Sequence, residues 1–433
     1  MKKLYTFCAM ALLAIIPLSA QQKTVSVQEP GTLCEQLTQE ELTTTTSIKI
    51  KGVVCEQDIN LLKLMSRDHA LTDIDLKEAM WVKKENSSGN VKFFDRNLKK
   101  LILTQYPNLD ANKDGEISIE EALTVNALDF GHESKEEMGE EEKIYFINGL
   151  EEFKNLDTLN LKNQFIKDAS PLYRLIKMSA LNLGGNDIDQ IDLSNMRFLE
   201  DLRAYGNHRL TSIDLSYNME LKELYLQSTG IKNIDISMLS KLKLALLNNG
   251  ELETVNFAGL ESLERIDMVK NKLTTIDASN TPKLKELHAN GNAIKNITLA
   301  GNPVLERLNV YDNQIETIDL SNCPKLSYLF IFDNKIATLN LGSLPELKQC
   351  FVSNNPLKTL DFQVNPLIFS IEAENMPNLE EINLKNNGFN QEAEYIIVYG
   401  NPKLKTVRCD KGEEETLLKN IFKNSPGVSI VAE

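Results

Sequence analysis

A twelve-residue stretch carries oxygen-bearing side chains at the alternating spacing that a calcium site requires. It runs from Asp110 to Glu121 and has the sequence DANKDGEISIEE. Ca²⁺ takes about six to eight oxygen ligands, and a loop of this length can wrap around it if a glycine allows the sharp turn. Gly115 stands at that turn, and Ile117 supplies an apolar contact. The predicted ligands are Asp110, Asn112, Asp114, Glu116 through its carbonyl, Ser118 directly or through water, and Glu121 with two oxygens.

This stretch resembles the loop of an EF-hand, which implies a helix on each side. We expect residues 97–104 to form the incoming helix and residues 120–125 the outgoing one. Only one such loop occurs in the sequence, where calcium sensors usually pair two, so we expect a structural Ca²⁺ site of modest affinity. The alternative is an acidic surface loop that binds nothing. The nearby acidic run at 132–142 is expected to be a solvated loop, with a secondary cation site as its alternative.

Residues for covalent chemistry are scarce. The chain has four histidines, and none stands at metal-ligand spacing from another. The sequence contains no G-x-S-x-G motif and no Cys/His constellation that would indicate a nucleophile and its base. Acidic pairs are plentiful, but no motif places them in a closed pocket. We therefore predict that the protein is not an enzyme. The histidines are His69, His132, His208 and His288.

Cysteine usage leaves two alternatives open. Beyond residue 20 the number of cysteines is odd, which argues against a fully bridged scaffold. Cys34 and Cys55 flank a short strand-like stretch, so they form either a disulfide bridge or two small buried residues. Cys350 stands where other repeats have Leu or Ile, so we expect it in the core.

The first twenty residues have the pattern of a secretory signal peptide. Lys2 and Lys3 precede an apolar run at 4–16, and Ala20 offers a small residue at a cleavage site before Gln21. No later apolar stretch is long enough to cross a bilayer, so no membrane insertion is expected. We predict a secreted or cell-surface protein, with the periplasm as the alternative. The formal charge of −15 disfavours nucleic acid and anionic membranes as partners.

The chain repeats itself every 21 or 22 residues. Each copy approximates L-x-L-x-x-N-x-I-x-x-I-D-L-S, and L-x-L alternates with the period of a strand. The Asn five residues after the first Leu can donate and accept hydrogen bonds between coils. The residues that open the copies are Leu159, Leu181, Leu202, Leu224, Ala245, Ile266, Leu287, Leu308, Leu329, Cys350 and Ile371. The asparagines are Asn186, Asn207, Asn271, Asn292, Asn313, Asn334 and Asn355.

The I-D-L-S segment alternates as well, so we expect a second short strand on the opposite side of each coil. It occurs at 191–194, 213–216 and 318–321. A coil with two apolar edges cannot bury them alone, whereas stacked coils about 4.8 Å apart form one continuous core. The sequence therefore predicts a mainly β solenoid with short strands on two faces of each coil.

The L-x-L-x-x-N spacing resembles leucine-rich repeat proteins. The 21-residue period with I-D-L-S resembles internalin-like bacterial repeats, especially those of secreted proteins of the Bacteroidetes type. The resemblance covers about 150–407, and Gln164, Thr229, Gly250 and Met376 depart from its Asn. It implies that the ligand is an extracellular or host surface protein, as it is for an adhesin. We expect a monomeric, non-catalytic protein that binds this ligand through the concave face of the solenoid. The alternatives are a glycan-binding protein and a structural surface-layer protein.

The remaining segments are expected to close the two ends of the solenoid, because an open end exposes core. We divide the chain into a signal peptide (1–20), an α/β N-terminal cap (21–130) whose strands continue the solenoid's sheet, the repeats (131–410) and a helical C-terminal cap (411–433). In the first cap we expect helices at 32–42 and 58–65 and strands at 47–53 and 71–76. In the second, a helical face is shared by Leu417, Leu418, Ile421 and Phe422.

Large aromatic side chains mark the expected partner surface. In a leucine-rich repeat, residues one and three positions after each opening residue point outward from a concave sheet. Most of them here are polar or small, but on three adjacent coils they are Tyr311, Phe330, Phe332 and Phe351. Such residues anchor interfaces and stack on sugars. The alternative is a register shifted by one, which would place them in the core. Arg203, Tyr205 and Tyr225 form a weaker second patch.

Overall fold

The computed structural model describes residues 22–83, 89–388, 395–423, 425 and 427–433, so the predicted signal peptide lies outside the described residues. The chain forms two compact units. Of the described residues, 22–83, 89 and 93–97 form the N-terminal unit, and 90–92 with those from 98 onward form the solenoid unit.

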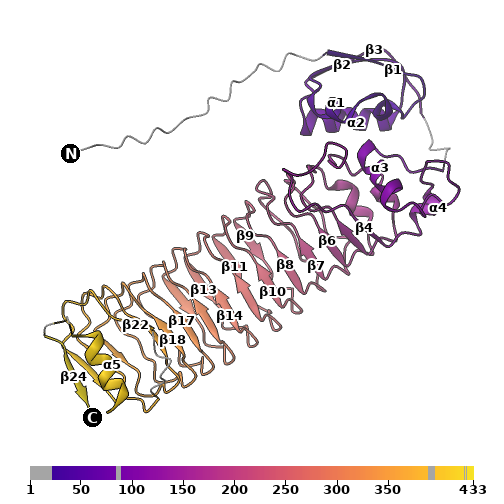
Figure 1. The fold of residues 1–433 in the computed structure, drawn as a ribbon. Helices are drawn as coiled ribbons and strands as arrows, with labels where there is room; N and C mark the ends of the chain where they lie inside the picture. Colours follow the sequence, from indigo (N-terminus) through magenta and orange to yellow (C-terminus); the bar gives the residue numbers. More distant parts are fainter. Residues whose placement is uncertain (1–21, 84–88, 389–394, 424, 426) are drawn as a thin grey trace, which may run out of the picture. The chain divides into compact units, whose positions relative to one another are not determined.

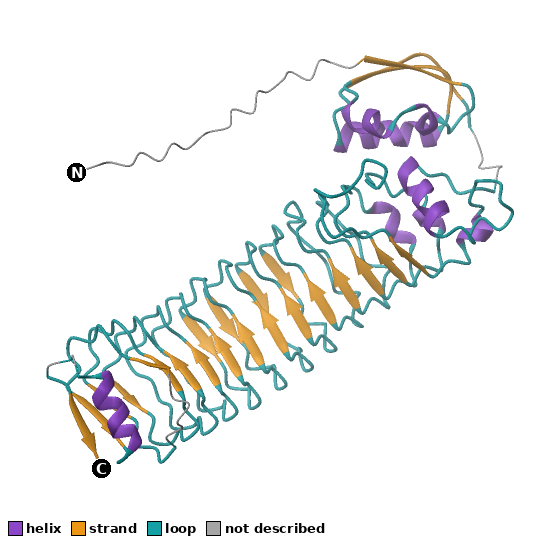
Figure 2. Ribbon diagram, viewed as in Figure 1, coloured by secondary structure: helices purple, strands orange, loops and turns teal. Residues whose placement is uncertain are grey.

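The N-terminal unit is a small α/β fold with its own sheet. Three parallel strands, β1 (Gln22–Val27), β2 (Ser47–Val54) and β3 (Asp73–Trp81), lie in the order β1-β2-β3. Figure 2 shows its helices on one face of this sheet. Ile48 and Ile50 point to that face and are fully buried. The helical elements are η1 (Leu33–Gln36), α1 (Gln39–Thr44) and α2 (Glu56–Asp68).

A buried carboxylate holds this unit together. Asp58 is 2 % exposed and accepts the backbone N–H groups of Gly31 at 2.6 Å and Leu33 at 3.0 Å. It also caps α2 by accepting the N–H of Cys55 at 2.9 Å. A buried carboxylate is tolerated where several donors replace its hydration. Asp58 therefore joins the segment after β1 to the start of α2.

Two predictions for this region need correction. The expected strands at 47–53 and 71–76 exist as β2 and β3, but they do not continue the solenoid's sheet. Alternation within a strand identifies its buried face and does not identify the sheet it joins. The single helix expected at 32–42 is divided into η1 and α1, because Thr38 forms a capping box with Glu41 and starts a new helix there. The helix predicted at 58–65 is confirmed within α2.

The solenoid is built on one thirteen-stranded parallel sheet, here called the main sheet (Figure 1). Each of the eleven predicted opening residues is the central residue of a three-residue strand and pairs with the next along the sheet, as Leu308 does with Leu329. The prediction of stacked coils is confirmed, and β4 and β22 extend it at the two ends. The strands are β4 (Ala127–Asp129), β5 (Thr158–Asn160), β6 (Ala180–Asn182), β7 (Asp201–Arg203), β8 (Glu223–Tyr225), β10 (Leu244–Leu246), β12 (Arg265–Asp267), β14 (Glu286–His288), β16 (Arg307–Asn309), β17 (Tyr328–Phe330), β18 (Gln349–Phe351), β20 (Ser370–Glu372) and β22 (Tyr395–Ile397).

Strands on the opposite side of the coils are fewer than predicted. They form three small parallel sheets, none of which includes the I-D-L-S segments at 191–194, 213–216 and 318–321. The Leu of each segment is still buried, and its Asp side chain accepts the N–H two residues later. A hollow lined by Ile213, Asn233 and Met238 among others opens between one segment and its neighbour. The strands present are β9 (Asn233–Asp235), β11 (Thr254–Asn256), β13 (Thr275–Asp277), β15 (Asn296–Thr298), β19 (Thr359–Asp361), β21 (Glu381–Asn383), β23 (Thr406–Cys409) and β24 (Ser429–Ala432).

The repeated asparagines form a ladder of hydrogen bonds from coil to coil, as predicted. Asn334 donates to the carbonyl of Val310 in the preceding coil at 2.9 Å and to Ile331 in its own coil at 3.1 Å. Its amide oxygen accepts the N–H of Ile315 at 2.9 Å. Each such Asn satisfies buried backbone groups of two coils. The same pattern holds for Asn186, Asn207, Asn271, Asn292, Asn313 and Asn355.

Four coils have another residue in place of the ladder Asn, and they differ in how their backbone groups are hydrogen-bonded. Gln164 performs the same task, because it accepts from Ile144 at 2.8 Å and donates to Phe130 at 2.7 Å. The Met376 side chain cannot make these bonds, and the next rung is formed by Asn401, whose amide oxygen accepts the Met376 N–H at 2.8 Å. Thr229 bonds only to its own turn, through the carbonyl of Leu226. Gly250 has no side chain to offer, so the ladder is interrupted at two successive coils.

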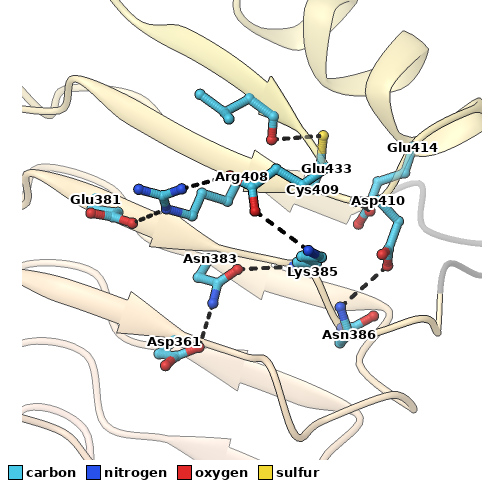
Figure 3. A network of polar contacts seen from close by, with 11 residues as sticks. Asp361, Glu381, Asn383, Lys385, Asn386, Arg408, Cys409, Asp410, Glu414 and Glu433 are labelled. Atoms are coloured by element: carbon cyan, nitrogen blue, oxygen red, sulfur yellow. Dashed lines mark hydrogen bonds and ion pairs between the residues drawn. The ribbon is translucent and has the colours of Figure 1, made fainter.

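The C-terminal end is closed by α5 (Glu413–Ile421) and β24, which pairs with β23. Leu418 and Phe422 are buried, in agreement with the predicted helical face. A polar network crosses the last coils, with Arg408 between Glu381 and Glu433 (Figure 3). Two short 3-10 helices, η2 (Leu150–Glu152) and η3 (Ser170–Arg174), lie in the first coils.

Candidate functional site

The four predicted aromatics lie on the outer face of the main sheet. Leu308, Val310, Leu329 and Ile331 are fully buried, so the inward positions are already filled. The aromatics themselves are half-buried. The alternative of a register shifted by one, with these rings in the core, is therefore wrong. They are Tyr311, Phe330, Phe332 and Phe351.

The rings pack on one another across neighbouring coils. Tyr311 and Phe332 stack with centroids 4.2 Å apart and an interplanar angle of 10°. Phe330 and Phe351 lie 4.7 Å apart and are tilted by 42°. Side chains on parallel strands in register are held at this spacing by the backbone. The result is a preorganised apolar surface with little side-chain freedom left to lose on binding.

Sequence reasoning missed a fifth ring. Tyr328 stands one position before the opening Leu329, on the same face as Phe330. The guanidinium of Arg307 lies 4.0 Å from the Tyr328 centroid and 5.9 Å from that of Phe330. Successive side chains of a strand point to opposite faces, so the position before the opening residue also lies on the outer face. The sequence itself therefore indicates that Tyr328 points outward. Together these rings form an aromatic strip, which comprises Tyr311, Tyr328, Phe330, Phe332 and Phe351.

The polar neighbours of the aromatic strip differ at its two ends. Toward the N-terminus, Asn309 donates to His288 at 2.7 Å, and His288 in turn contacts Glu286 at 3.2 Å. Toward the C-terminus, Phe351 pairs in register with Glu372, and Glu374 follows two residues later. Burial and the nearby Glu374 carboxylate raise the pKa of Glu372. The strip therefore runs from a bonded polar cluster to a carboxylate pair.

The second predicted patch is bonded internally. Arg203 lies 4.6 Å from the Tyr225 ring centroid and makes an ion pair with Asp201 at 2.8 Å. The Tyr225 hydroxyl donates to Glu223 at 2.7 Å, and burial followed by this hydrogen bond raises the Tyr225 pKa to about 12. Tyr205 covers Gly184, where a Cβ would meet its ring at 2.3 Å. Arg203 and Tyr225 already have polar partners, so this patch offers a partner protein less than the aromatic strip does.

The predicted calcium loop lies between α3 (Arg96–Gln105) and α4 (Ile119–Ala122). The incoming helix matches the expectation, and the outgoing helix is shorter than the expected 120–125. Gly115 has a φ of +77°, which fits the sharp turn. The carbonyl of Ile117 accepts the N–H of Val91 at 2.7 Å, and the Ile117 side chain is fully buried. The loop is thus anchored to the solenoid unit at its midpoint.

The loop's oxygens are turned toward its own backbone. Asp110 accepts the N–H groups of Asp114 at 3.1 Å and Gly115 at 3.0 Å. Glu121 accepts from Ala111 at 2.8 Å and from the Ser118 N–H at 2.8 Å, and the Ser118 bonds lower the Glu121 pKa. Within the described residues no three His, Cys, Asp or Glu side chains converge as metal ligands. The donor set itself, all hard oxygen, suits Ca²⁺, so calcium binding stays a prediction.

The predicted contributions of the other loop residues are compatible with this geometry. Asn112 accepts the N–H of Asp114 at 3.0 Å. The side chain of Glu116 makes an ion pair with Lys99 at 2.5 Å, which leaves its carbonyl as the ligand that we predicted. The Ser118 hydroxyl caps α4 by accepting the N–H of Glu121 at 3.1 Å. A capping hydroxyl retains a second lone pair for a cation or a water molecule.

The cysteines of the described chain are buried free thiols. Cys34 and Cys55 are 6 % and 5 % exposed, and burial raises the Cys34 pKa to about 12. Of the two alternatives for this pair, the structure has two small buried residues. Cys350 is fully buried on the main sheet, which confirms its place in the core.

No protein-family model and no curated protein matches the sequence. Solved structures do match. The chain is similar to the functional domain of InlJ from Listeria monocytogenes, which includes a cysteine ladder, with 22% identity and a TM-score of 0.55 over 68% of this chain and 70% of that one. It is similar to the Listeria internalin InlF, with 23% identity and a TM-score of 0.50 over 71% and 95% of the two chains. A leucine-rich repeat protein of Leptospira interrogans matches with 15% identity and a TM-score of 0.51 over 93% and 100%.

At these identities the likeness concerns the fold, and the fold is that of a leucine-rich repeat solenoid. Its long parallel sheet and few helices agree with the sequence-based prediction. None of the helices in the described ranges is long and apolar enough to cross a membrane.

Proposed function

We propose that the protein is an exported, non-catalytic binding protein that recognises another protein through the outer face of its main sheet, at the aromatic strip. The observation that carries this proposal is five aromatic rings, held in register on adjacent coils and left partly exposed. Rigid aromatics that are partly desolvated before binding are favoured interface anchors. The likeness to internalins is consistent with a secreted or cell-surface, adhesin-like protein.

Two features favour a protein over a glycan as the partner. A sugar ring needs an open aromatic face and planar amides beside it. Tyr311 and Phe332 cover one face of each other, and Asn309 donates its amide to His288. Asn290, the other amide beside the strip, is only 7 % exposed. A surface of packed apolar rings suits apolar side chains of a protein better than it suits sugar hydroxyls.

The test uses the chain from residue 21 onward, immobilised in calcium and probed with extracellular proteins and a glycan array. A Phe330→Ser, Phe332→Ser double variant is run beside it, after circular dichroism has shown that it folds. We expect a protein ligand that binds the wild type and is lost in the variant. A ligand that both bind equally would move the site elsewhere. Self-association with no external ligand would favour the structural surface-layer alternative.

We further propose that the loop at 110–121 binds calcium as a structural ion. Its residues would supply oxygens that the backbone N–H groups already hold in place, and a bound ion would stabilise the junction between α3 and α4. Calcium should therefore raise the Tm of the wild type, and Asp110→Ala with Glu121→Ala should remove the gain.

The quantity to compare is the calcium-induced shift in Tm, because Glu121 also caps α4 and its loss lowers the Tm without any ion. Glu261→Ala with Glu316→Ala is the matched control, since both side chains are exposed, lie outside the loop and remove the same charge. The control should keep the full shift. A wild-type Tm that chelator leaves unchanged would contradict a structural ion.

A further inference from the structure

The C-terminal end of the aromatic strip meets two carboxylates on the same face. Phe330, Phe351 and Glu372 are register partners on β17, β18 and β20. Glu374 occupies the equivalent position to Phe332 two coils later, and Ser353 stands between them. The Ser353 hydroxyl accepts the N–H of Glu374 at 3.0 Å, which fixes the backbone at this point. On this face the rings on the coils of β17 and β18 are therefore followed, on the next coil, by the carboxylates of Glu372 and Glu374.

These carboxylates are left without a cation, in contrast to other acids of the sheet. Glu286 pairs with Arg265 at 3.3 Å and Asp201 with Arg203 at 2.8 Å. Across the described ranges, no Lys, Arg or His lies within ion-pair distance of Glu372 or Glu374. Two neighbouring carboxylates repel each other, and a cation between them would relieve that repulsion.

The neighbouring rings favour a cation at the same place. Tyr311 covers one face of Phe332, and on the other side the next coil presents only the short side chain of Ser353 in that row. The π face of an aromatic ring attracts a cation within about 6 Å of its centroid. A positive group beside Phe332 and Phe351 would therefore meet ring faces and two carboxylates together.

Building on the proposed function, we propose that this end of the aromatic strip binds a lysine or arginine side chain of an extended segment of the partner protein. The apolar neighbours of that side chain would pack on Phe330 and Phe351. The net charge of −15 steers basic partners toward the protein at low ionic strength. The site thus selects a segment in which basic and apolar residues alternate.

The test measures binding of fluorescent synthetic peptides to the chain from residue 21 onward by anisotropy. Three peptides of equal length alternate Leu with Lys, with Gln or with Glu. We expect the Lys peptide to bind, and Glu372→Gln with Glu374→Gln to weaken it about tenfold or more. Added salt should weaken binding in the wild type and have less effect in that variant. Glu261→Gln with Glu316→Gln removes the same charge from exposed positions off the sheet and should leave the affinity unchanged.

The outcomes separate this inference from the proposed function. If the Gln and Lys peptides bind equally and Glu372→Gln with Glu374→Gln has no effect, while Phe330→Ser with Phe332→Ser abolishes binding, the basic partner is refuted and the strip remains the site. If the control variant weakens binding as much as Glu372→Gln with Glu374→Gln, the Lys peptide is attracted by the net charge of the protein and not by these two carboxylates. The inference is then wrong. Failure of the wild type to bind the Lys peptide also overturns it. Lys-peptide binding that Phe330→Ser with Phe332→Ser leaves intact contradicts the strip itself.

Discussion

Two stretches of the solenoid use the same repeat and differ in how their coils are joined. From Asn271 to Asn355 every coil contributes a ladder asparagine, and the aromatic strip lies on the outer face of the later coils. At Thr229 and Gly250 the ladder is interrupted, and a small apolar cavity lies beside Thr229, Ile231 and Leu252. On the outer face of the Thr229 coil, the Tyr225 hydroxyl donates to Glu223, and Arg203 of the preceding coil lies over the Tyr225 ring.

The difference indicates what each part contributes. Where the ladder is continuous, buried backbone groups of adjacent coils are satisfied by one rigid side chain, and the rings above them are held in fixed register. Where it is interrupted, the backbone hydrogen bonds of the sheets still join the coils, but the ladder side chain no longer does, and packing around a cavity is weaker. We infer that the recognition surface lies on the more rigid stretch.

The largest effect is expected from breaking the continuous ladder. Asn334→Ala removes the donor to Val310 and Ile331 and the acceptor for Ile315, in a site that is 7 % exposed. Leaving several buried backbone groups unpaired should lower the free energy of unfolding by about 3 kcal/mol. Urea denaturation measures this, and a loss below about 1 kcal/mol would show that the ladder is not a main source of stability.

A smaller effect, dependent on pH, is expected where the solenoid ends. Burial raises the pKa of Glu414 to about 7 from a usual value of 4.5, while its carboxylate accepts the N–H of Asp410 at 2.7 Å. Between about pH 4.5 and about pH 7, the folded state therefore keeps a proton that the unfolded state has released. The free energy of unfolding falls as the pH rises through this range. Above about pH 7 this loss of folding stability no longer changes with pH.

Glu414→Gln should abolish that fall, because glutamine does not titrate and still accepts from Asp410. We expect a gain on the order of 2 kcal/mol at pH 8 and little change at pH 4. Unfolding curves at both pH values provide the measurement. Equal effects at the two pH values would mean that the carboxyl is not the titrating group. The ladder amides do not titrate, so Asn334→Ala should cost the same at both.

The smallest effect is expected at the interruption itself. Thr229→Val keeps the shape of the side chain and removes one hydrogen bond, to the carbonyl of Leu226. The expected loss is about 1 kcal/mol, well below that of Asn334→Ala. Denaturation of the two variants under identical conditions gives the comparison. Equal losses would refute the idea that coils at Thr229 are joined less strongly.

Much of this contrast could be predicted from the sequence, because a fixed period of 21 or 22 residues sets strand register and side-chain direction together. The ladder, its departures at Thr229 and Gly250, and the outward position of Phe330 all follow from that period. The separate sheet of β1–β3 did not follow, because alternation does not identify the partner of a strand. The outward position of Tyr328 follows from the alternation of a strand, because it stands one residue before Leu329, but the leucine-rich repeat pattern marks only the outward positions after Leu329.

The most direct measurement compares the two stretches as binding surfaces. Phe330→Ser with Phe332→Ser, and Tyr205→Ser with Tyr225→Ser, are tested against the same protein ligand by surface plasmon resonance, after both variants have been shown to fold. We predict that the first pair loses binding and that the second keeps an affinity close to wild type. Loss of binding in the second pair with retention in the first would contradict the account.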